Sequence, residues 1–241
     1  MLSILIPLRD EFDNLDNIVD KFDQNLQNIN YEVILINDFS SDKTFEKAKS
    51  ICSTKKNYKI YNNEKKGLGG ALSLGIEKVE GKYTCIMMAD LSDDINDLKS
   101  YYKEISENKL DAIFGSRFMS SSEVKNYPFD KLILNRIFNF FVSFLFFNSY
   151  TDFTNAFKIY KSDVLKNFLP LISESFNIFL EMPLKIISRK YKYKIIPINW
   201  HARKRGKAKF NIKELRSKYL FTLIYCFIEK ILLNKKNKSA N

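Results

Sequence analysis

Cysteine and histidine are scarce in this chain of 241 residues. Its three cysteines, Cys52, Cys85 and Cys226, lie far apart without a CxxC pair, and there is a single histidine. A disulfide framework and a zinc site both need clustered ligands, so these counts argue against either. They are typical of a protein of the reducing cytosol. The first segment also lacks the basic region of a signal peptide, and we expect none.

Glycine and proline are also scarce, with 7 and 5 residues. Hydrophobic residues make up 45% of the chain, including 21 Phe and 13 Tyr. This composition disfavours disorder, and the length is enough for one domain with a full core.

The two most apolar segments, 132–147 and 219–233, both fall short of a membrane span. Charged or polar residues interrupt each of them, whereas a spanning helix needs about 20 consecutive apolar residues. Two interpretations are open. Each segment is either a core helix or an amphipathic helix that lies in a membrane interface. We favour the second, with the protein peripheral on the anionic cytoplasmic face of a membrane.

The charge is unevenly distributed along the chain. The net charge is +11 overall, yet residues 1–184 hold 22 Lys+Arg against 26 Asp+Glu, and residues 185–241 hold 17 against 2. The basic end predicts an anionic partner such as nucleic acid, a membrane surface or a phosphorylated substrate. For the last seven residues a solvated lysine-rich tail is an equal alternative.

Strand patterns alternate with helical patterns through the first 105 residues. Apolar runs near residues 2, 31, 58 and 83 predict strands, and the segments after them have helical spacing. This order predicts a mostly parallel sheet with right-handed crossovers. In such sheets ligands bind beyond the carboxyl ends of the strands. Those ends carry polar loops at residues 7–11, 37–38, 62–70 and 90–94.

A glycine-rich stretch, "KKGLGGAL" (65–72), resembles part of a dinucleotide-binding fingerprint. That fingerprint normally follows the first strand of its unit, whereas this stretch follows the third. The loop after the first strand has no glycine. A dinucleotide-binding fold is therefore disfavoured, and so is a P-loop, because no GKS/T follows.

Several motifs occur in an order typical of one family. They are "ILIPLRDE" (4–11), "INDFSSDKT" (36–44), "KGLGGAL" (66–72), "MMADLSDD" (87–94), "FGSRF" (114–118), "LILNRIFN" (132–139), "TDFTNAFKIYKSDVL" (151–165), "FNIFLEM" (176–182) and "RKRGKAKF" (203–210). Together they resemble family-2 glycosyltransferases with the α/β, Rossmann-like GT-A fold, and particularly the polyprenol-phosphate branch that includes dolichol-phosphate mannose synthases. The resemblance implies a GT-A domain over residues 1–212 and a basic, amphipathic, membrane-associated helix over 213–241.

The resemblance also implies a donor site. Residues that would border the nucleotide are Pro7, Arg9, Glu11, Ile36, Asp38, Gly67, Ala89 and Asp90. A turn-capping aspartate is the alternative for Asp38, given the serines beside it.

A metal site is implied in the same turn. Asp90 would bind Mg²⁺ or Mn²⁺ across the diphosphate, with Ser92, Asp93 or water completing the shell. The family's first metal-binding aspartate is Met88 here, and its glutamine is Ser92. Asp94 and Asp97 are interpreted as residues of the first turn of the next helix.

Four cations are assigned to the acceptor by the resemblance: Arg117, Arg136, Arg203 and Lys209. With Asp90 at the metal, Arg117, Arg203 and Lys209 would form the catalytic set. An acceptor phosphate is already ionised near pH 7, so it needs cations rather than a general base. The alternative for Arg117 and Arg136 is a surface ion pair.

The function implied is inverting transfer of a hexose from a nucleotide diphosphate sugar, of the GDP-mannose or UDP-glucose type, to a polyprenyl phosphate. One alternative keeps the fold with a glycan hydroxyl acceptor and Asp93 or Asp152 as base. Another is a non-catalytic nucleotide-sugar-binding protein. Nucleic acid is disfavoured as a partner because the strand-end carboxylates would have no role in binding it. A separate membrane-anchoring subunit is a further possible partner.

Overall fold

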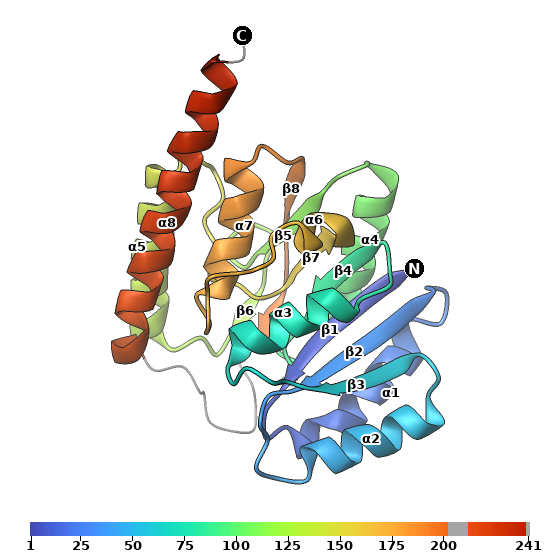
Figure 1. The fold of residues 1–241 in the computed structure, drawn as a ribbon. Coiled ribbons are helices and arrows are strands. Elements are labelled where there is room, and N and C mark those ends of the chain that lie inside the picture. Colours follow the sequence, from blue (N-terminus) through green and yellow to red (C-terminus); the bar gives the residue numbers. More distant parts are fainter. Residues whose placement is uncertain (202–211, 240–241) are drawn as a thin grey trace.

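A seven-stranded sheet forms the centre of the molecule in this computed structural model (Figure 1), which describes the backbone of residues 1–201 and 212–239 and the side chains of 1–201 and 217–234. The strands run in the order β3-β2-β1-β4-β7-β5-β8, and only β7 is antiparallel to its neighbours. The mostly parallel sheet expected from the sequence is confirmed. The strands are β1 (Leu2–Leu8), β2 (Tyr31–Asn37), β3 (Tyr58–Asn62), β4 (Tyr83–Ile86), β5 (Ala112–Ser116), β7 (Lys158–Lys161) and β8 (Tyr193–Pro197).

Helices cover both faces of the sheet. Beside the sheet, β6 (Val124–Lys125) pairs with β9 (Trp200–His201). The helices are η1 (Phe12–Asn14), α1 (Leu15–Asn25), α2 (Thr44–Thr54), α3 (Leu68–Lys78), α4 (Ile95–Glu107), α5 (Phe129–Leu145), α6 (Ser162–Lys166), α7 (Ile178–Ser188) and α8 (Ile212–Ser239).

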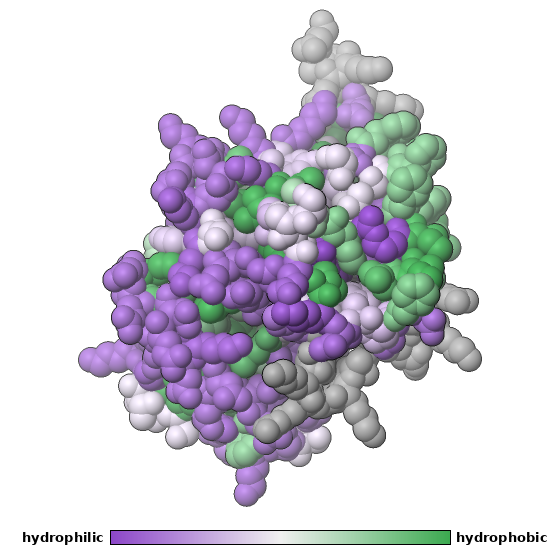
Figure 2. All heavy atoms as spheres, turned by 180° about the vertical axis from the view of Figure 1, so that it is seen from behind, coloured by the Kyte–Doolittle hydropathy of each residue, from purple (hydrophilic) through white to green (hydrophobic). Residues whose placement is uncertain are grey.

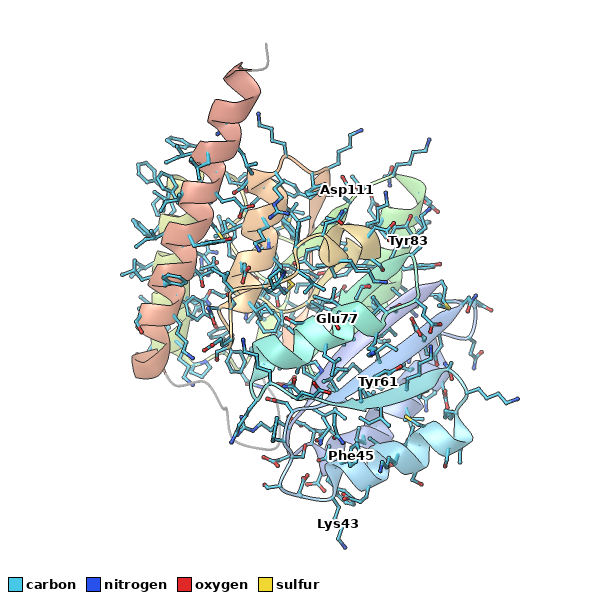
Figure 3. All side chains as sticks on the ribbon, viewed as in Figure 1. Lys43, Phe45, Tyr61, Glu77, Tyr83 and Asp111 are labelled. Carbon is cyan, nitrogen blue, oxygen red and sulfur yellow. The ribbon has the colours of Figure 1, made fainter. Side chains whose placement is uncertain are left out.

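Two apolar cores lie on the two faces of the sheet. Strand side chains alternate between faces, so Leu5 and Ile36 join the core under α3, α6 and α7, whereas Ile4 and Leu35 join the core under α1, α2 and α4. Figure 3 shows side chains filling the space between the helices and the sheet, while Lys43 at the start of α2 points away from it. The sheet is therefore buried on both faces, as expected for parallel strands.

Strand β4 ends earlier than the sequence predicts. The apolar run extends to Ala89, but pairing with β1 stops at Leu5 and Ile86. Pro7 explains this end, since a proline in β1 has no N–H to donate to β4. Residues from Met87 onward are thereby released into a loop at the carboxyl edge of the sheet.

Helix α8 packs along α5 and α7, and Figure 1 shows α5 and α8 side by side. The Thr222 hydroxyl accepts a hydrogen bond from Asn177 Nδ2 at 2.9 Å, and Glu229 pairs with Arg189 at 2.7 Å. Apolar side chains of α8 are found both buried, as Leu223, and exposed, as Phe221. The helix expected after residue 212 is present, but an amphipathic division of its faces is not confirmed.

Candidate active site

Three loops meet at the carboxyl edge of the sheet, after β1, β2 and β4. Each contains one non-glycine residue in the left-handed region: Asp10 (φ 53°), Phe39 (φ 56°) and Leu91 (φ 56°). Such conformations are uncommon and persist where surrounding contacts hold them. Their concentration at one edge marks it as a candidate site.

The loops after β1 and β2 are tied to each other. The Asp10 N–H donates to Ser40 Oγ at 3.1 Å, and the Asp10 carboxylate accepts from the Ser41 N–H at 2.7 Å. The Glu11 N–H donates to Thr44 Oγ1 at 2.8 Å. Arg9, predicted to border the nucleotide, is exposed between these contacts. These two loops are therefore held in one arrangement by short side chains.

Asp38 connects the second strand to the glycine loop. Its side chain is buried, and Oδ1 accepts hydrogen bonds from Asn63 Nδ2 and the Gly67 N–H, both at 2.8 Å. This geometry gives Asp38 a role in holding the glycine loop, and its partners are not the neighbouring serines on which the turn-capping alternative was based. Ile36, by contrast, lies wholly within the core, so only its backbone reaches the edge of the sheet.

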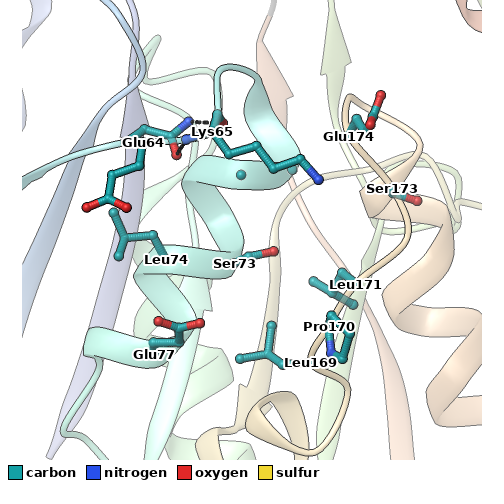
Figure 4. A pocket seen from close by; sticks show the side chains of 13 residues that line it. Glu64, Lys65, Ser73, Leu74, Glu77, Leu169, Pro170, Leu171, Ser173 and Glu174 are labelled. Carbon is teal, nitrogen blue, oxygen red and sulfur yellow. Dashed lines mark hydrogen bonds between the residues drawn. The ribbon is translucent and has the colours of Figure 1, made fainter.

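The glycines of the glycine loop allow it to pack closely against the segment 173–174. A Cβ on Gly67, at φ 120°, would lie 2.8 Å from Glu174 O, and one on Gly69 would lie 1.9 Å from Ser173 O. The Gly69 N–H donates to Glu174 O at 3.1 Å. Side chains at these glycines would push the segment 173–174 away. Figure 4 shows the adjoining groove, with Lys65 on one wall and Glu174 on the other.

The turn after β4 presents the carboxylate that was predicted to bind metal. Asp90 is half-buried, and its Oδ1 accepts hydrogen bonds from Ser92 N at 3.1 Å and Ser92 Oγ at 2.7 Å. No group of three or more His, Cys, Asp or Glu that could hold a metal occurs in the described part of the chain. Mg²⁺ is usually held by one or two carboxylates together with substrate phosphates, so Asp90 with Ser92 fits a cation that arrives with a diphosphate.

Asp93, the third predicted metal ligand, lies deeper. It is 5% exposed, and its Oδ2 has no hydrogen-bond partner among the described residues. Burial and, to a smaller extent, the nearby Asp90 together raise the pKa of this carboxyl to about 7, although Arg117 opposes the shift. A single β-bridge joins Asp93 to Trp200. Asp94 caps α4 by accepting from the Asn96 N–H at 2.8 Å, as expected.

On the other side of β4, Arg117 forms a buried bidentate pair with Asp152. Arg117 Nε donates to Oδ2 at 2.9 Å, and Nη2 donates to Oδ1 at 2.7 Å. The Arg117 backbone N–H also donates to Oδ2 at 2.9 Å. Asp152 is fully buried, and the negative charge beside Arg117 raises the guanidinium pKa despite the opposing effect of burial. The predicted alternative of a surface ion pair does not describe this buried contact.

Arg136 approaches Arg117 through a shared aromatic ring. The Arg136 guanidinium carbon lies 4.4 Å from the centroid of Phe118, and that of Arg117 lies 5.3 Å from it. Tyr127 and Trp200 lie within 5.6 Å of Arg117 in the same way. Two cations that were assigned to the acceptor from distant segments are therefore neighbours. Arg203 and Lys209 lie outside the described residues.

The sequence motifs did not predict a role for two residues of this region, Phe118 and Lys158. Phe118 was quoted only as the last residue of the motif "FGSRF", and no role was assigned to Lys158. Lys158 is buried and donates to the carbonyls of Phe153 and Asn155, and burial lowers its pKa to about 7. The only signal in the sequence that could have identified Lys158 is its position among apolar residues of a strand, where a lysine is unusual.

A family model described as glycosyl transferase family 2 matches residues 3–169 of this sequence. The chain belongs to this family. Curated relatives agree with the branch suggested by the motifs. Dolichol-phosphate mannosyltransferase of Pyrococcus furiosus is 30% identical over 135 residues, which cover 56% of this chain and 38% of that protein. Dolichyl-phosphate beta-glucosyltransferase of Dictyostelium discoideum is 27% identical over 187 residues, 71% of this chain and 57% of that protein. The matches thus span less than two thirds of either relative.

Solved structures resemble the fold of this family member over most of its length. A mycobacterial protein superposes with a TM-score of 0.72 at 12% identity, covering 94% of this chain and 74% of the other. Glucosyl-3-phosphoglycerate synthase of Mycobacterium tuberculosis, in complex with Mn²⁺, UDP and phosphoglyceric acid, gives a TM-score of 0.68 at 13% identity, with 94% and 78% covered. At these identities the likeness shows the fold, and it confirms the expected GT-A class.

Proposed function

We propose that this chain is an inverting glycosyltransferase that moves a hexose from a nucleotide diphosphate sugar to a polyprenyl phosphate. An oxygen of the acceptor phosphate attacks the anomeric carbon from the face opposite the leaving group. The new carbon–oxygen bond forms as the bond to the nucleotide diphosphate breaks. The acceptor oxygen is already ionised near pH 7, so the step needs no proton transfer from it.

The arrangement of Arg117 and Arg136 around Phe118 is the observation that carries this proposal. Two phosphate groups about 4 Å apart would repel by several kcal/mol at a protein-like effective dielectric constant. Cations are therefore required where they meet. Asp152 is a poor candidate for a general base, because it is fully buried and both of its oxygens accept from Arg117. Arg203 and Lys209, which lie outside the described residues, are also proposed to bind the acceptor phosphate.

On the donor side, Asp90 and Ser92 are proposed to hold Mg²⁺ or Mn²⁺. Such a cation would supply Lewis-acid neutralisation of the charge on the leaving diphosphate. Pro7, Arg9, Glu11, Asp38, Gly67 and Ala89 are proposed to border the nucleotide from the loops at the same edge. Asp90 is half-buried and lies in the same turn as the buried residues Ser92 and Asp93, which supports this role.

Membrane association is proposed from the surface of α5 and α8. Figure 2 shows a broad hydrophobic area along one side of the molecule, and Phe140 and Phe144 of α5 are 71% and 68% exposed. Leu220, Phe221 and Ile224 of α8 are also exposed. Within the described residues, no helix is long and apolar enough to cross a bilayer. We therefore propose a peripheral protein on the cytoplasmic face, where this side meets the lipid that carries the acceptor.

A transfer assay tests the proposal. Labelled sugar from GDP-mannose, UDP-glucose or UDP-N-acetylglucosamine is offered to a polyprenyl phosphate and, in parallel, to the same lipid as a free alcohol. We expect transfer from one donor to the phosphate only, because the alcohol carries no negative charge for the arginines to bind. Transfer to both forms at equal rates would refute the phosphate acceptor.

A glycan hydroxyl acceptor is the second candidate function. The raised pKa of Asp93, about 7, is in the range that suits a general base. Replacing Asp93 with Asn separates the two candidates. A hydroxyl acceptor predicts that transfer collapses, whereas the phosphate acceptor predicts that transfer persists without a proton acceptor at this position.

A further inference from the structure

The loop after β2 holds an exposed aromatic ring on an unfavourable backbone. Phe39 has φ 56°, and its side chain is 47% exposed. Bulky residues such as phenylalanine rarely adopt the left-handed region, which glycine, asparagine and aspartate tolerate better. Nearly half of this residue nevertheless stays exposed to solvent. An outlier of this kind is a reason to look for a function of the side chain.

Neighbouring contacts fix the conformation of this loop. The Asp38 N–H donates to Leu8 O at 2.7 Å, and the Ser40 N–H donates to Asn37 Oδ1 at 3.3 Å. Ser40 Oγ accepts from the Asp10 N–H at 3.1 Å. The backbone on both sides of Phe39 is therefore anchored, and the ring is presented from a rigid support.

The equivalent position after β1 shows that the conformation does not require a phenylalanine. Leu8 pairs with Asn37 across β1 and β2, and Asp10 and Phe39 each lie two residues further on. Both are left-handed, at φ 53° and φ 56°. Aspartate tolerates this region, and its carboxylate accepts from Ser41. Phenylalanine has neither advantage, so the fold alone does not explain it.

The place of Phe39 relative to Asp90 matches the length of a nucleotide. Only β1 separates β2 from β4 in the sheet, and neighbouring strands lie about 4.8 Å apart, so the two strand ends are separated by roughly 10 Å. In the proposed function the diphosphate lies at Asp90, and the acceptor cations lie beyond β4 on the side of β5 and β7. The nucleoside must then extend the other way, towards β2.

We propose that Phe39 stacks on the base of the donor nucleotide and so supplies much of the affinity for the nucleoside. This inference rests on the proposed function, because it uses the diphosphate position at Asp90. Base–aromatic stacking tolerates different bases, and its loss weakens binding by about 10-fold or more. The ring would contribute to binding whichever nucleotide carries the sugar.

Direct binding measurements on the full chain test this role. The probes are GDP, UDP and inorganic pyrophosphate, each with Mg²⁺, titrated calorimetrically into the wild type, Phe39→Ala, Phe39→Gly and Phe39→Trp. We expect the Ala and Gly variants to lose about 10-fold in affinity for the preferred nucleotide and to bind pyrophosphate as the wild type does. The Trp variant should retain nucleotide binding. Phe45→Ala, which removes a partly exposed ring from α2, is the matched control and should change neither affinity.

Thermal unfolding distinguishes lost stacking from a damaged loop. Glycine adopts a positive φ freely, so Phe39→Gly should keep or raise the melting temperature while it loses nucleotide affinity. Unchanged nucleotide affinity in Phe39→Ala would overturn the inference, as would an equal loss for pyrophosphate. A wild type that binds nucleotides and yet transfers sugar to no acceptor would overturn the proposed function alone.

Discussion

The two halves of this molecule owe their shape to different kinds of contact. In residues 2–107 each strand is followed by a helix, and short polar side chains such as Asp10 and Ser41 tie neighbouring loops together. In the second half an antiparallel strand, β7, enters the sheet, and buried charges such as Arg117 with Asp152 hold the loops. The first half, the proposed donor half, thus depends on hydrogen bonds from short polar side chains between loops, and the second half, the proposed acceptor half, depends on a buried ion pair. Single substitutions should therefore damage the two halves differently.

The largest effect is expected in the donor half, at Asp90. Asp90→Asn removes the charge proposed to bind the metal, and it keeps an oxygen that can accept from Ser92 as Asp90 Oδ1 does. Lewis-acid stabilisation of a leaving group is worth several kcal/mol, so turnover should fall by about 100-fold or more. Initial rates of sugar transfer over a range of Mg²⁺ and Mn²⁺ concentrations measure this. Asp94→Asn is the matched control, since Asp94 caps α4, and it should keep most of the activity.

The next largest effect is expected in the acceptor half, at the buried ion pair. Arg117→Met or Asp152→Leu alone leaves one charge buried without its partner, which should lower the free energy of unfolding by about 3–5 kcal/mol. The double variant removes both charges and should recover part of that loss, because the Arg117 backbone N–H still lacks its acceptor. Transfer to the lipid phosphate should stay lost in the double variant, because the cation is gone. Urea unfolding and the transfer assay together measure these outcomes.

A surface pair provides the control for this experiment. Lys47 and Asp16 lie 2.6 Å apart, but Asp16 is largely exposed, so Asp16→Ala should change the free energy of unfolding by less than about 1 kcal/mol. Recovery of activity together with stability in the double variant at Arg117 and Asp152 would show that this pair is structural only.

The same contrast explains which features of the structure could be predicted from the sequence alone. The alternating pattern predicted the strands β1 to β4 and the helices α1 to α4, since each depends on its own residues. The end of β4 was placed too late, because it depends on Pro7 in a neighbouring strand. In the second half the nine-motif order located Arg117 and Arg136, but no local pattern shows that Phe118 lies between them or that Asp152 pairs with Arg117. Such contacts depend on the assembled fold.

Buried Lys158 gives the acceptor half a pH dependence of stability. Burial lowers its pKa to about 7 in the folded protein, whereas an unfolded lysine keeps its proton to about pH 10. Between these values the unfolded chain binds more protons, so the free energy of unfolding rises with pH. Relative to Lys158→Met, the wild type should gain about 2 kcal/mol between pH 7.5 and pH 9. Urea unfolding at several pH values measures this, and a constant difference over that window would contradict it.

The smallest effect is expected at the exposed face of α5, and it should separate lipid use from donor use. Phe140→Ser and Phe144→Ser each remove an exposed ring without touching the core. If these rings enter a bilayer, each substitution should weaken binding to anionic vesicles by roughly 10-fold, which corresponds to the loss of part of one buried aromatic side chain. Phe12→Ser, with a ring 38% exposed in η1 at the donor half, is the control and should bind vesicles as the wild type does.

Sedimentation with vesicles measures binding, and a short-chain, water-soluble acceptor phosphate shows whether catalysis itself is intact. The KM for the nucleotide sugar should remain unchanged in both α5 variants, because the loops proposed to bind the donor follow β1, β2 and β4 and do not belong to α5. Equal sedimentation of the wild type and of both α5 variants would show that this face does not meet the membrane.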